Sequence, residues 1–277
     1  MSSSMFQAQR IAGALAKRMH KAPGHRFLSQ GTSASSASED TADKARKVVV
    51  FGGNGFVGQS VCQAALRLGA EVVSISRSGA PAGKDKKSWA DDVRWVRADI
   101  FKPENYTPEL SGADGVVSCV GGFGSNAHME KLCGDATVVA TEAAEQAGVE
   151  RFVFVSAAGA QHEHLVLNGY WKGKRKAEAA VLERFPEGGV ILRASGIYGN
   201  RDVGPVTLPL GAVMQPLEML LNLSPFAYLR SASPLEPMLT PPVAVDSVAR
   251  VAAGGALGLV PSGVLLVDEI NRLAKDI

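Results

Sequence analysis

The sequence predicts an α/β fold: a doubly wound, mostly parallel sheet with a small irregular C-terminal lobe. Short apolar runs rich in β-branched residues alternate with segments of helical pattern, which is typical of a parallel sheet covered by helices on both faces. The first apolar run leads into a glycine-rich turn, residues 52–58, and then into a helix. A strand, a glycine-rich turn and a helix in that order indicate a Rossmann sheet.

Each expected strand is a short apolar run, and each expected helix follows a turn signal. We expect strands at Lys47–Phe51, Glu71–Ser76, Val93–Ala98, Gly115–Val120, Arg151–Ser156, Gly189–Ala194 and Val264–Val267. Helices should begin near Gly55, Ala127, Asn168 and Asp246. The longest helix is expected from Ala127 to Ala147, ending at Gly148, with one face formed by Leu132, Val139, Ala143 and Ala147.

The N-terminal segment has the composition of an organellar transit peptide. Residues 1–28 hold five basic residues and no acidic one, together with serines and spaced apolar residues. We expect a mitochondrial transit peptide at 1–28 and a disordered, serine-rich linker at 29–45, the alternative being a disordered tail without a targeting role. Without the leader, 24 basic residues (29 minus five) face 27 acidic ones, so the charge does not indicate nucleic-acid binding.

Neither a metal site nor a membrane span is expected. The three cysteines, Cys62, Cys119 and Cys133, form no CxxC pair and have no histidine cluster beside them, so we expect reduced thiols. No uncharged apolar run reaches the roughly 18 to 20 residues that a helix needs to span a bilayer. A proline-rich stretch at about 200–242 should form the irregular lobe, which either closes the substrate side of the sheet or docks on a partner.

The glycine-rich turn is the expected cofactor site. Gly52 permits the tight turn, Gly55 lets the backbone approach a pyrophosphate, and Gly58 allows close packing of helix on strand. The helix N-terminus offers unpaired amides and a partial positive charge to phosphates. We therefore expect residues 46–277 to form an NAD(P)-binding domain, in which the turn residues Asn54, Phe56 and Val57 also contact the cofactor.

The end of the second strand predicts which dinucleotide is bound. An NAD site usually places a carboxylate roughly 20 residues past the glycines, to accept from the ribose 2′-hydroxyl. This sequence has Arg77 between two serines there, which favours a 2′-phosphate and hence NADP(H), with NAD(H) still open. The alternative is that Arg77 is only a solvated charge at a strand end.

Three further residues are expected along the cofactor. Asp99 ends the third strand, where an adenine amino group is often bound, although a simple turn residue is equally consistent with this position. Val120 and Gly121 end the fourth strand, where small residues leave room for the nicotinamide half.

A tyrosine and a lysine four residues apart suggest acid–base chemistry. Tyr170 and Lys174 project from one face of the expected helix, and a nearby ammonium should lower the phenol pKa from its usual value of about 10. Tyr170 would then act as general acid or base. Ser156, at the end of the fifth strand, is expected to hydrogen-bond the substrate oxygen. The alternative is an ordinary surface pair on an amphipathic helix.

These motifs resemble the short-chain dehydrogenase/reductase superfamily in its extended, atypical branch. The matching segments are Gly52–Gly58, Val155-Ser156, Tyr170–Lys174 and Arg193–Gly199. Three segments, Val73–Gly79, Ala98–Pro103 and Gly169–Glu178, are similar to those of a mitochondrial subgroup that has a fungal member in the coenzyme Q biosynthetic complex. That subgroup is related to the nucleotide-binding (39 kDa-type) accessory subunit of respiratory complex I.

The resemblance implies a matrix protein, peripheral to the inner membrane or free, that joins one of these complexes. It implies that Lys174 also binds the nicotinamide ribose. Two departures stand out: Ala127–Ala147 contains no asparagine for a proton relay, and Ala194 replaces a common proline. Two hypotheses follow: an NADP(H)-dependent enzyme acting on a quinone-related or other hydrophobic carbonyl compound, or a structural subunit stabilised by bound nucleotide.

Overall fold

The structure, a computed structural model, describes residues 45–81, 88–161, 166–203, 206–209 and 240–277. All of these residues belong to one compact unit, Lys44–Ile277. The expected transit peptide, nearly all of the expected linker and most of the expected lobe lie outside the described residues. Among those described, no helix has both the length and the apolar character needed to cross a membrane.

Seven parallel strands form the central sheet, in the order β3-β2-β1-β4-β5-β6-β11. The strand order reverses between β1 and β4, and ligands of such sheets bind at the carboxyl ends of the strands at this point. The strands are β1 (Lys47–Phe51), β2 (Glu71–Ser76), β3 (Val93–Arg97), β4 (Gly115–Ser118), β5 (Arg151–Ala157), β6 (Gly189–Ala194) and β11 (Gly263–Leu266).

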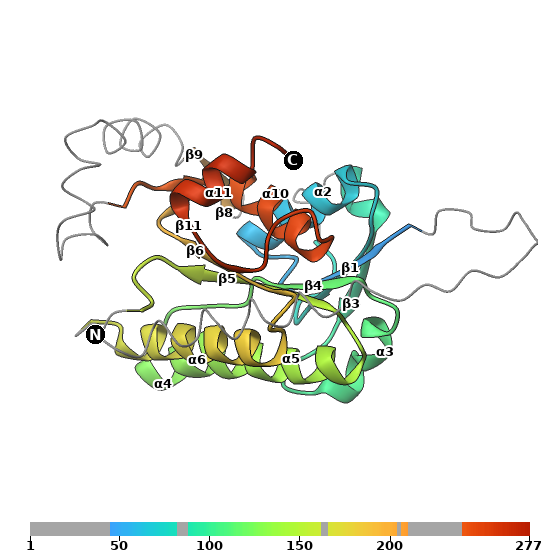
Figure 1. Cartoon of the computed structure of the whole chain (residues 1–277), viewed down its shortest axis with the longest axis horizontal. Helices are drawn as coiled ribbons and strands as arrows, with labels where there is room; N and C mark the ends of the chain where they lie inside the picture. The colour runs from blue at the N-terminus through green and yellow to red at the C-terminus, as the bar shows by residue number, and fades with distance from the viewer. Residues whose placement is uncertain (1–44, 82–87, 162–165, 204–205, 210–239) are drawn as a thin grey trace, which may run out of the picture. The chain divides into compact units, whose positions relative to one another are not determined.

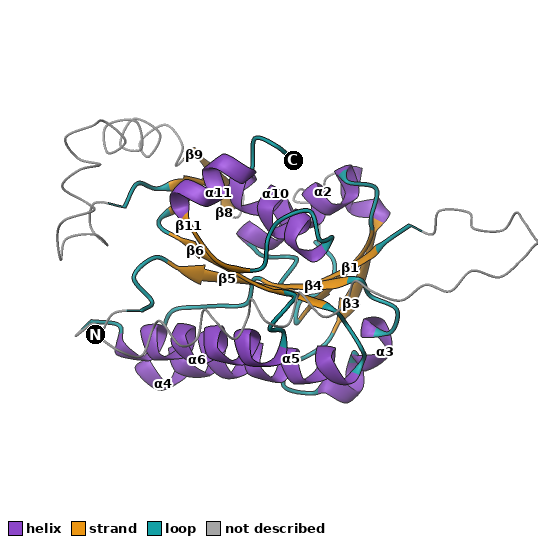
Figure 2. Cartoon of the chain, viewed as in Figure 1, coloured by secondary structure: helices purple, strands orange, loops and turns teal. Residues whose placement is uncertain are grey.

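Helices cover both faces of this sheet (Figures 1 and 2). Side chains alternate along β1, so that Val48 and Val50 pack into one core and Val49 and Phe51 into the other. The first layer contains α2 (Phe56–Arg67), α10 (Val245–Ala256) and α11 (Val267–Leu273). The second contains α3 (Thr107–Leu110), α4 (Asn126–Glu130), α5 (Ala136–Gln146) and α6 (Asn168–Arg184).

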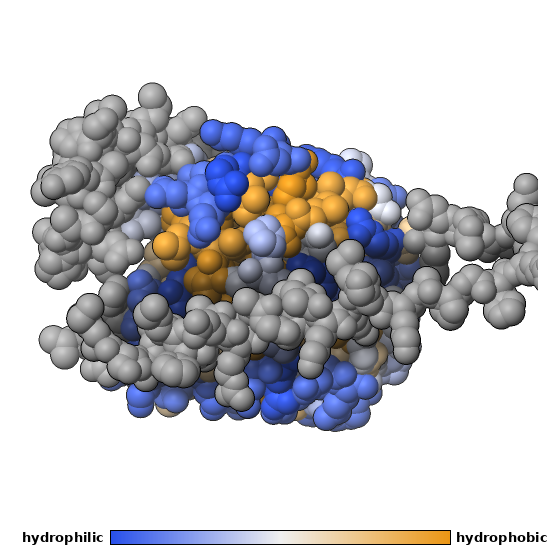
Figure 3. Space-filling view, in the orientation of Figure 1, coloured by the Kyte–Doolittle hydropathy of each residue, from blue (hydrophilic) through white to orange (hydrophobic). Residues whose placement is uncertain are grey.

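Smaller elements complete the described residues. Short 3₁₀ turns lie at Ser88–Asp92 and Pro103–Asn105. Two further strand pairs follow β6: β7 (Ile197–Tyr198) with β10 (Val243–Ala244), and β8 (Asn200–Val203) with β9 (Val206–Pro209). Figure 3 shows apolar side chains gathered on one face over the region of α10, and two exposed leucines, Leu259 and Leu266, follow α10 in the chain.

The predicted fold class is confirmed, and all seven expected strands are present within two residues of their expected ends. Buried runs of valine and isoleucine explain this agreement, because strands covered on both faces read as continuous apolar runs.

The prediction of one continuous helix from Ala127 to Ala147 is wrong, because the structure interrupts it. The helix begins at Asn126, and a π-helical turn, Lys131–Asp135, separates α4 from α5. A π turn adds a residue to the helical repeat, so the buried face rotates. Of the four residues expected on that face only Ala143 is buried; the face consists of Ala136, Thr137, Ala140, Thr141, Ala143 and Ala144.

Close glycine contacts join this interrupted helix to α6. A Cβ on Gly134 would lie 2.7 Å from the Gly173 Cα atom, so neither backbone leaves room for a side chain. One turn earlier, a Cβ on Gly169 would overlap the Asn126 backbone, and the Gly169 N–H donates to the Asn126 side chain at 3.1 Å. These contacts fix α6, which carries Tyr170 and Lys174, against the segment that follows β4.

Candidate functional site

The glycine-rich turn has the geometry expected of a phosphate-binding turn. Gly52 has φ +77°, a left-handed conformation that favours glycine, and its N–H donates to the Ile75 carbonyl at 2.8 Å. A Cβ on Gly58 would lie 2.2 Å from the Gly52 carbonyl oxygen, so α2 packs directly on the turn. No side-chain hydrogen bond caps α2 at Gly55, and a helix N-terminus attracts anions through its partial positive charge.

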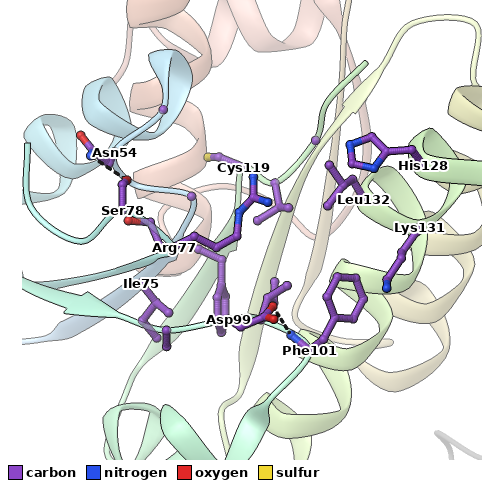
Figure 4. Close-up of a pocket in the computed structure, with 18 residues that line it drawn as sticks. Asn54, Ile75, Arg77, Ser78, Asp99, Phe101, Cys119, His128, Lys131 and Leu132 are labelled. Carbon is purple, nitrogen blue, oxygen red and sulfur yellow. Dashed lines mark hydrogen bonds between the residues drawn. The ribbon is translucent and has the colours of Figure 1, made fainter. Parts of the chain in front are cut away.

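A cavity of about 750 Å³ opens beside this turn, at the carboxyl ends of β1 to β4 (Figure 4). Helix α4 and the π turn form its other wall. The lining includes seven of the residues expected at the cofactor: Gly52, Asn54, Gly55, Arg77, Asp99, Val120 and Gly121. Ser76 and Ser78, the two serines beside Arg77, line it as well. The sequence predictions missed Phe101, Cys119, His128, Lys131 and Leu132, which also line it.

Arg77 projects into this cavity from the end of β2 (Figure 4). Its loop is held by several hydrogen bonds: Ser76 Oγ accepts from the Gly79 N–H at 3.1 Å, and Arg97 Nε donates to the Arg77 carbonyl at 3.1 Å. The Asn54 side chain donates to Ser78 Oγ at 2.9 Å, which ties the loop to the glycine turn. Arg77 is therefore presented on a preformed loop.

The remaining cavity wall combines one carboxylate with two basic side chains. Asp99 Oδ1 accepts from the Phe101 N–H at 3.1 Å, as in an Asx turn, while the residue also lines the cavity. Lys131 Nζ lies 4.8 Å from the centre of the Phe101 ring, and His128 extends from α4 on the same side (Figure 4). With Arg77 opposite, the lining has more basic than acidic groups and favours an anionic ligand.

Tyr170 and Lys174 lie together on α6, as the spacing predicts. Lys174 is buried; its Nζ donates to the Val155 carbonyl at 2.7 Å and lies 5.7 Å from the centre of the Tyr170 ring. Burial lowers the Lys174 pKa, because desolvation disfavours the ammonium.

The expected depression of the tyrosine pKa is wrong for the protein without ligand. Burial raises the pKa of Tyr170 to about 12, with a smaller contribution from Cys133. The cause is desolvation of the phenolate, which here outweighs any effect of the neighbouring lysine. Tyr170 is therefore a neutral phenol near pH 7, the protonation state of a general acid.

Ser156 is held by a buried ion pair. Its hydroxyl donates to Glu178 Oε1 at 2.5 Å, and Arg193 Nη2 donates to Glu178 Oε2 at 2.7 Å. Ser156 and Arg193 are partners across β5 and β6, so both side chains face α6. The serine proton is thus directed to a carboxylate rather than to the cavity.

The structure separates the predicted residues into two groups. One group lines the cavity. The other does not: Phe56, Val57 and Gly58 form the start of α2, and Ser156, Tyr170 and Lys174 lie at the β5–α6 side. Within the described residues no cluster of three or more histidine, cysteine or acidic side chains could hold a metal ion.

A family profile described as NAD(P)H-binding matches residues 52–200, which spans the glycine turn, the cavity and α6. The chain belongs to this NAD(P)H-binding family. A helix N-terminus beside a basic cavity suits the phosphates of such a dinucleotide.

Two curated proteins are similar to this chain in sequence, and a solved structure is similar to it in fold. An uncharacterized chloroplastic protein of Arabidopsis thaliana is 40% identical over 234 residues, which covers 83% of this chain and 78% of that protein. MIOREX complex component 2 of Saccharomyces cerevisiae is 49% identical over 78 residues, 27% of this chain and 28% of that protein. The Bordetella bronchiseptica enzyme WbmH in complex with NAD+ has a TM-score of 0.57, 17% identity and coverage of 83% and 80% of the two chains; this likeness shows the fold alone.

Proposed function

We propose that the chain is an organellar NADP(H)-binding protein of the short-chain dehydrogenase/reductase type, which reduces a quinone-related or other hydrophobic carbonyl compound. The observation that carries the cofactor choice is Arg77. It extends into the cavity from a loop fixed by its neighbours, and no carboxylate stands at the end of β2 to accept from a ribose 2′-hydroxyl. Ser78 and Asn54 add polar groups beside it.

Titration of the full-length protein with NADPH and NADH tests this choice. A charge-assisted hydrogen bond is worth about 1.5–3 kcal/mol, so we expect NADPH to bind roughly 10- to 100-fold more tightly than NADH. Arg77→Glu should abolish that preference, whereas Arg272→Glu, the same charge change on an exposed residue of α11, should not. Equal binding of both nucleotides by the wild-type protein would contradict the proposal.

Bound NADPH supplies a hydride to the carbonyl carbon of the substrate. Tyr170 is a neutral phenol near pH 7, burial raises its pKa further, and it donates its proton to the carbonyl oxygen. Lys174 lies one turn along α6, and in its charged form it stabilises the phenolate that proton transfer leaves on Tyr170. The same side chain binds the nicotinamide ribose. Ser156, on β5, helps to position α6 through its hydrogen bond to Glu178.

The proposed location is an organelle, specifically the mitochondrial matrix or the matrix face of the inner membrane. The acid-free, serine-rich leader supports an organellar location, as do the two relatives, one chloroplastic and one a MIOREX complex component. The resemblance to a mitochondrial subgroup is the support for the matrix. The proposed partners are the coenzyme Q biosynthetic complex or respiratory complex I. A fusion of residues 1–28 to a fluorescent protein should accumulate in mitochondria; a cytosolic signal would contradict the assignment.

A non-catalytic subunit is the second candidate, and the bond between Ser156 and Glu178 favours it, because the serine proton is not directed to a substrate. In this second candidate function, bound nucleotide stabilises the fold. An apolar surface, such as the one over α10, then contacts a partner. Tyr170→Phe separates the two candidates. If the variant binds NADPH normally but fails to restore ubiquinone content in cells that lack the protein, chemistry is required; full restoration would favour the structural role.

A further inference from the structure

Glu178 continues the face of α6 that carries Tyr170 and Lys174. It lies four residues after Lys174, and residues four apart in a helix are neighbours on one face. Lys174 and Glu178 are both buried, each with only 5% of its surface exposed. Charged side chains are rarely buried to this extent unless they are paired, because desolvation disfavours the charged form. One face of the helix thus places a buried amine beside a buried carboxylate, next to the candidate proton donor.

Consecutive residues of β5 hold both charged groups. The Val155 carbonyl accepts a hydrogen bond from Lys174 Nζ at 2.7 Å, and the centre of the Phe154 ring lies 4.5 Å from the same nitrogen. The Ser156 hydroxyl donates to Glu178 Oε1 at 2.5 Å. A carbonyl oxygen and an aromatic ring both interact favourably with an ammonium group. Neither of them carries a full negative charge to offset the burial of that group.

The side chains that act on Lys174 differ in charge. Burial lowers its pKa, whereas Cys133, Cys119 and Glu178 each raise it to a smaller extent. Cys119 directly follows β4, and near pH 7 it is a neutral thiol, because burial raises its pKa to about 12. Cys133, in the π turn, donates its hydrogen to the Gly122 carbonyl. Within the described part of the chain, Glu178 is therefore the group whose negative charge favours a charged Lys174 near neutral pH.

Arg193 is a second cation at the same carboxylate. Its Nη2 donates to Glu178 Oε2 at 2.7 Å, and its side chain is 19% exposed. Tyr170, a neutral phenol near pH 7, adds no charge. Two cations therefore share one carboxylate, and removal of that carboxylate would leave two uncompensated positive charges in a poorly hydrated region. Like charges disfavour each other's charged form, and the amine, unlike the guanidinium, responds by losing its proton.

We propose that Glu178 is a positioning residue for proton transfer from Tyr170, because its carboxylate keeps the neighbouring Lys174 amine charged. The proposal rests on the reductase function, in which the charged amine stabilises the phenolate that remains on Tyr170. Glu178 acts through Lys174, since its own oxygens are occupied by Ser156 and Arg193.

Titration of the Lys174 amine tests this proposal directly. Nuclear magnetic resonance of the full-length protein, labelled with ¹³C at the lysine Cε atoms, follows the charge of each lysine with pH. The Lys174 signal is the one that Lys174→Arg removes. Glu178→Gln keeps the size and an oxygen acceptor for Ser156 but loses the charge, so Lys174 should bind its proton about 10-fold more weakly and titrate at lower pH. Arg193→Gln removes the competing cation and should move the titration to higher pH.

The control is Glu183→Gln, the same change at an exposed position of α6, which should leave the titration as in wild type. A Lys174 titration that is unchanged in Glu178→Gln overturns the proposal. So does one that moves to higher pH, because a carboxylate that only maintains packing would, on removal, admit water to the amine. If Glu178→Gln does not fold, Arg193→Gln decides, and a titration that does not move to higher pH overturns the proposal.

The reduction of acetophenone by NADPH separates the proposal from the function on which it rests. The rate should fall as pH rises through the titration of Lys174, and this fall should come at lower pH in Glu178→Gln. The same pH dependence in both proteins overturns the positioning role. If acetophenone is not reduced but the Lys174 titration shifts as expected, Glu178 still controls the charge of Lys174 and the reductase function fails for this substrate.

Discussion

Removal of the Glu178 carboxylate should destabilise the protein more than removal of any surface ion pair. Glu178 receives hydrogen bonds from Ser156 and from Arg193, and the two charged side chains are only 6% and 19% exposed. In Glu178→Ala the guanidinium loses its partner in a region that water reaches poorly. Breaking a buried ion pair in this way costs about 3–5 kcal/mol, and the partial exposure of Arg193 places the expected loss near the lower end, about 3 kcal/mol.

Urea unfolding of the full-length protein measures this loss as a shift of the transition midpoint at unchanged slope. The matched control is Lys176→Ala on the same helix. It removes an ion pair to Asp135 in which the side chains are 52% and 39% exposed, and such pairs contribute about 0–1 kcal/mol. Glu178→Gln keeps an acceptor for Ser156 but loses the charge, so it should fall between the two. A loss of less than about 1 kcal/mol in Glu178→Ala would refute this account of the network.

The other predictions concern helix contact, titration and the cofactor loop. Gly134→Ala should cost about 1–3 kcal/mol in urea unfolding, because its Cβ would lie 2.7 Å from Gly173. At pH 10.5, where an ordinary phenol is about three-quarters ionised, Tyr170→Phe should remove almost no phenolate absorbance, since the Tyr170 pKa is raised to about 12. Because that folded-state pKa exceeds the unfolded value, wild type should lose stability relative to Tyr170→Phe as pH rises from about 10 to about 12. Asn54→Ala should weaken NADPH binding by up to about 10-fold, because it removes the hydrogen bond to Ser78.

Three results would contradict the predictions for Gly134→Ala, Tyr170→Phe and Asn54→Ala. No change in stability for Gly134→Ala would show that the two helices do not need the close contact. If Tyr170→Phe lacks the phenolate absorbance of one tyrosine at pH 10.5, the Tyr170 pKa is not raised. Unchanged NADPH affinity in Asn54→Ala would show that the loop does not depend on its bond to the glycine turn.

The sheet was predictable because its strands carry their own signal. β1 and β6 are apolar runs that have no alternative to burial on both faces, and the turn after β1 combines three glycines whose spacing has a specific structural reason. The π turn was not predictable, because Lys131–Asp135 contains no local signal. Its position coincides with the contact between Gly134 and Gly173, residues 39 positions apart (173 − 134), which only the folded chain brings together.

The candidate site was predictable in its composition and less so in its electrostatics. Four-residue spacing places Tyr170 and Lys174 on one face of a helix, but it does not show that the ammonium is directed to the Val155 carbonyl. Ser156 was expected to bind substrate because it ends a strand, yet its partner Glu178 lies 22 residues away on α6. His128 and Lys131 line the cavity from a helix whose sequence has no binding motif.

The most direct test of the account is a crystal structure of the full-length protein with NADP+. The account predicts that the pyrophosphate accepts hydrogen bonds from the amides of the turn at residues 52–58, and that the 2′-phosphate lies within hydrogen-bonding distance of Arg77. Nucleotide bound elsewhere, or a 2′-phosphate directed away from Arg77 into solvent, would contradict it.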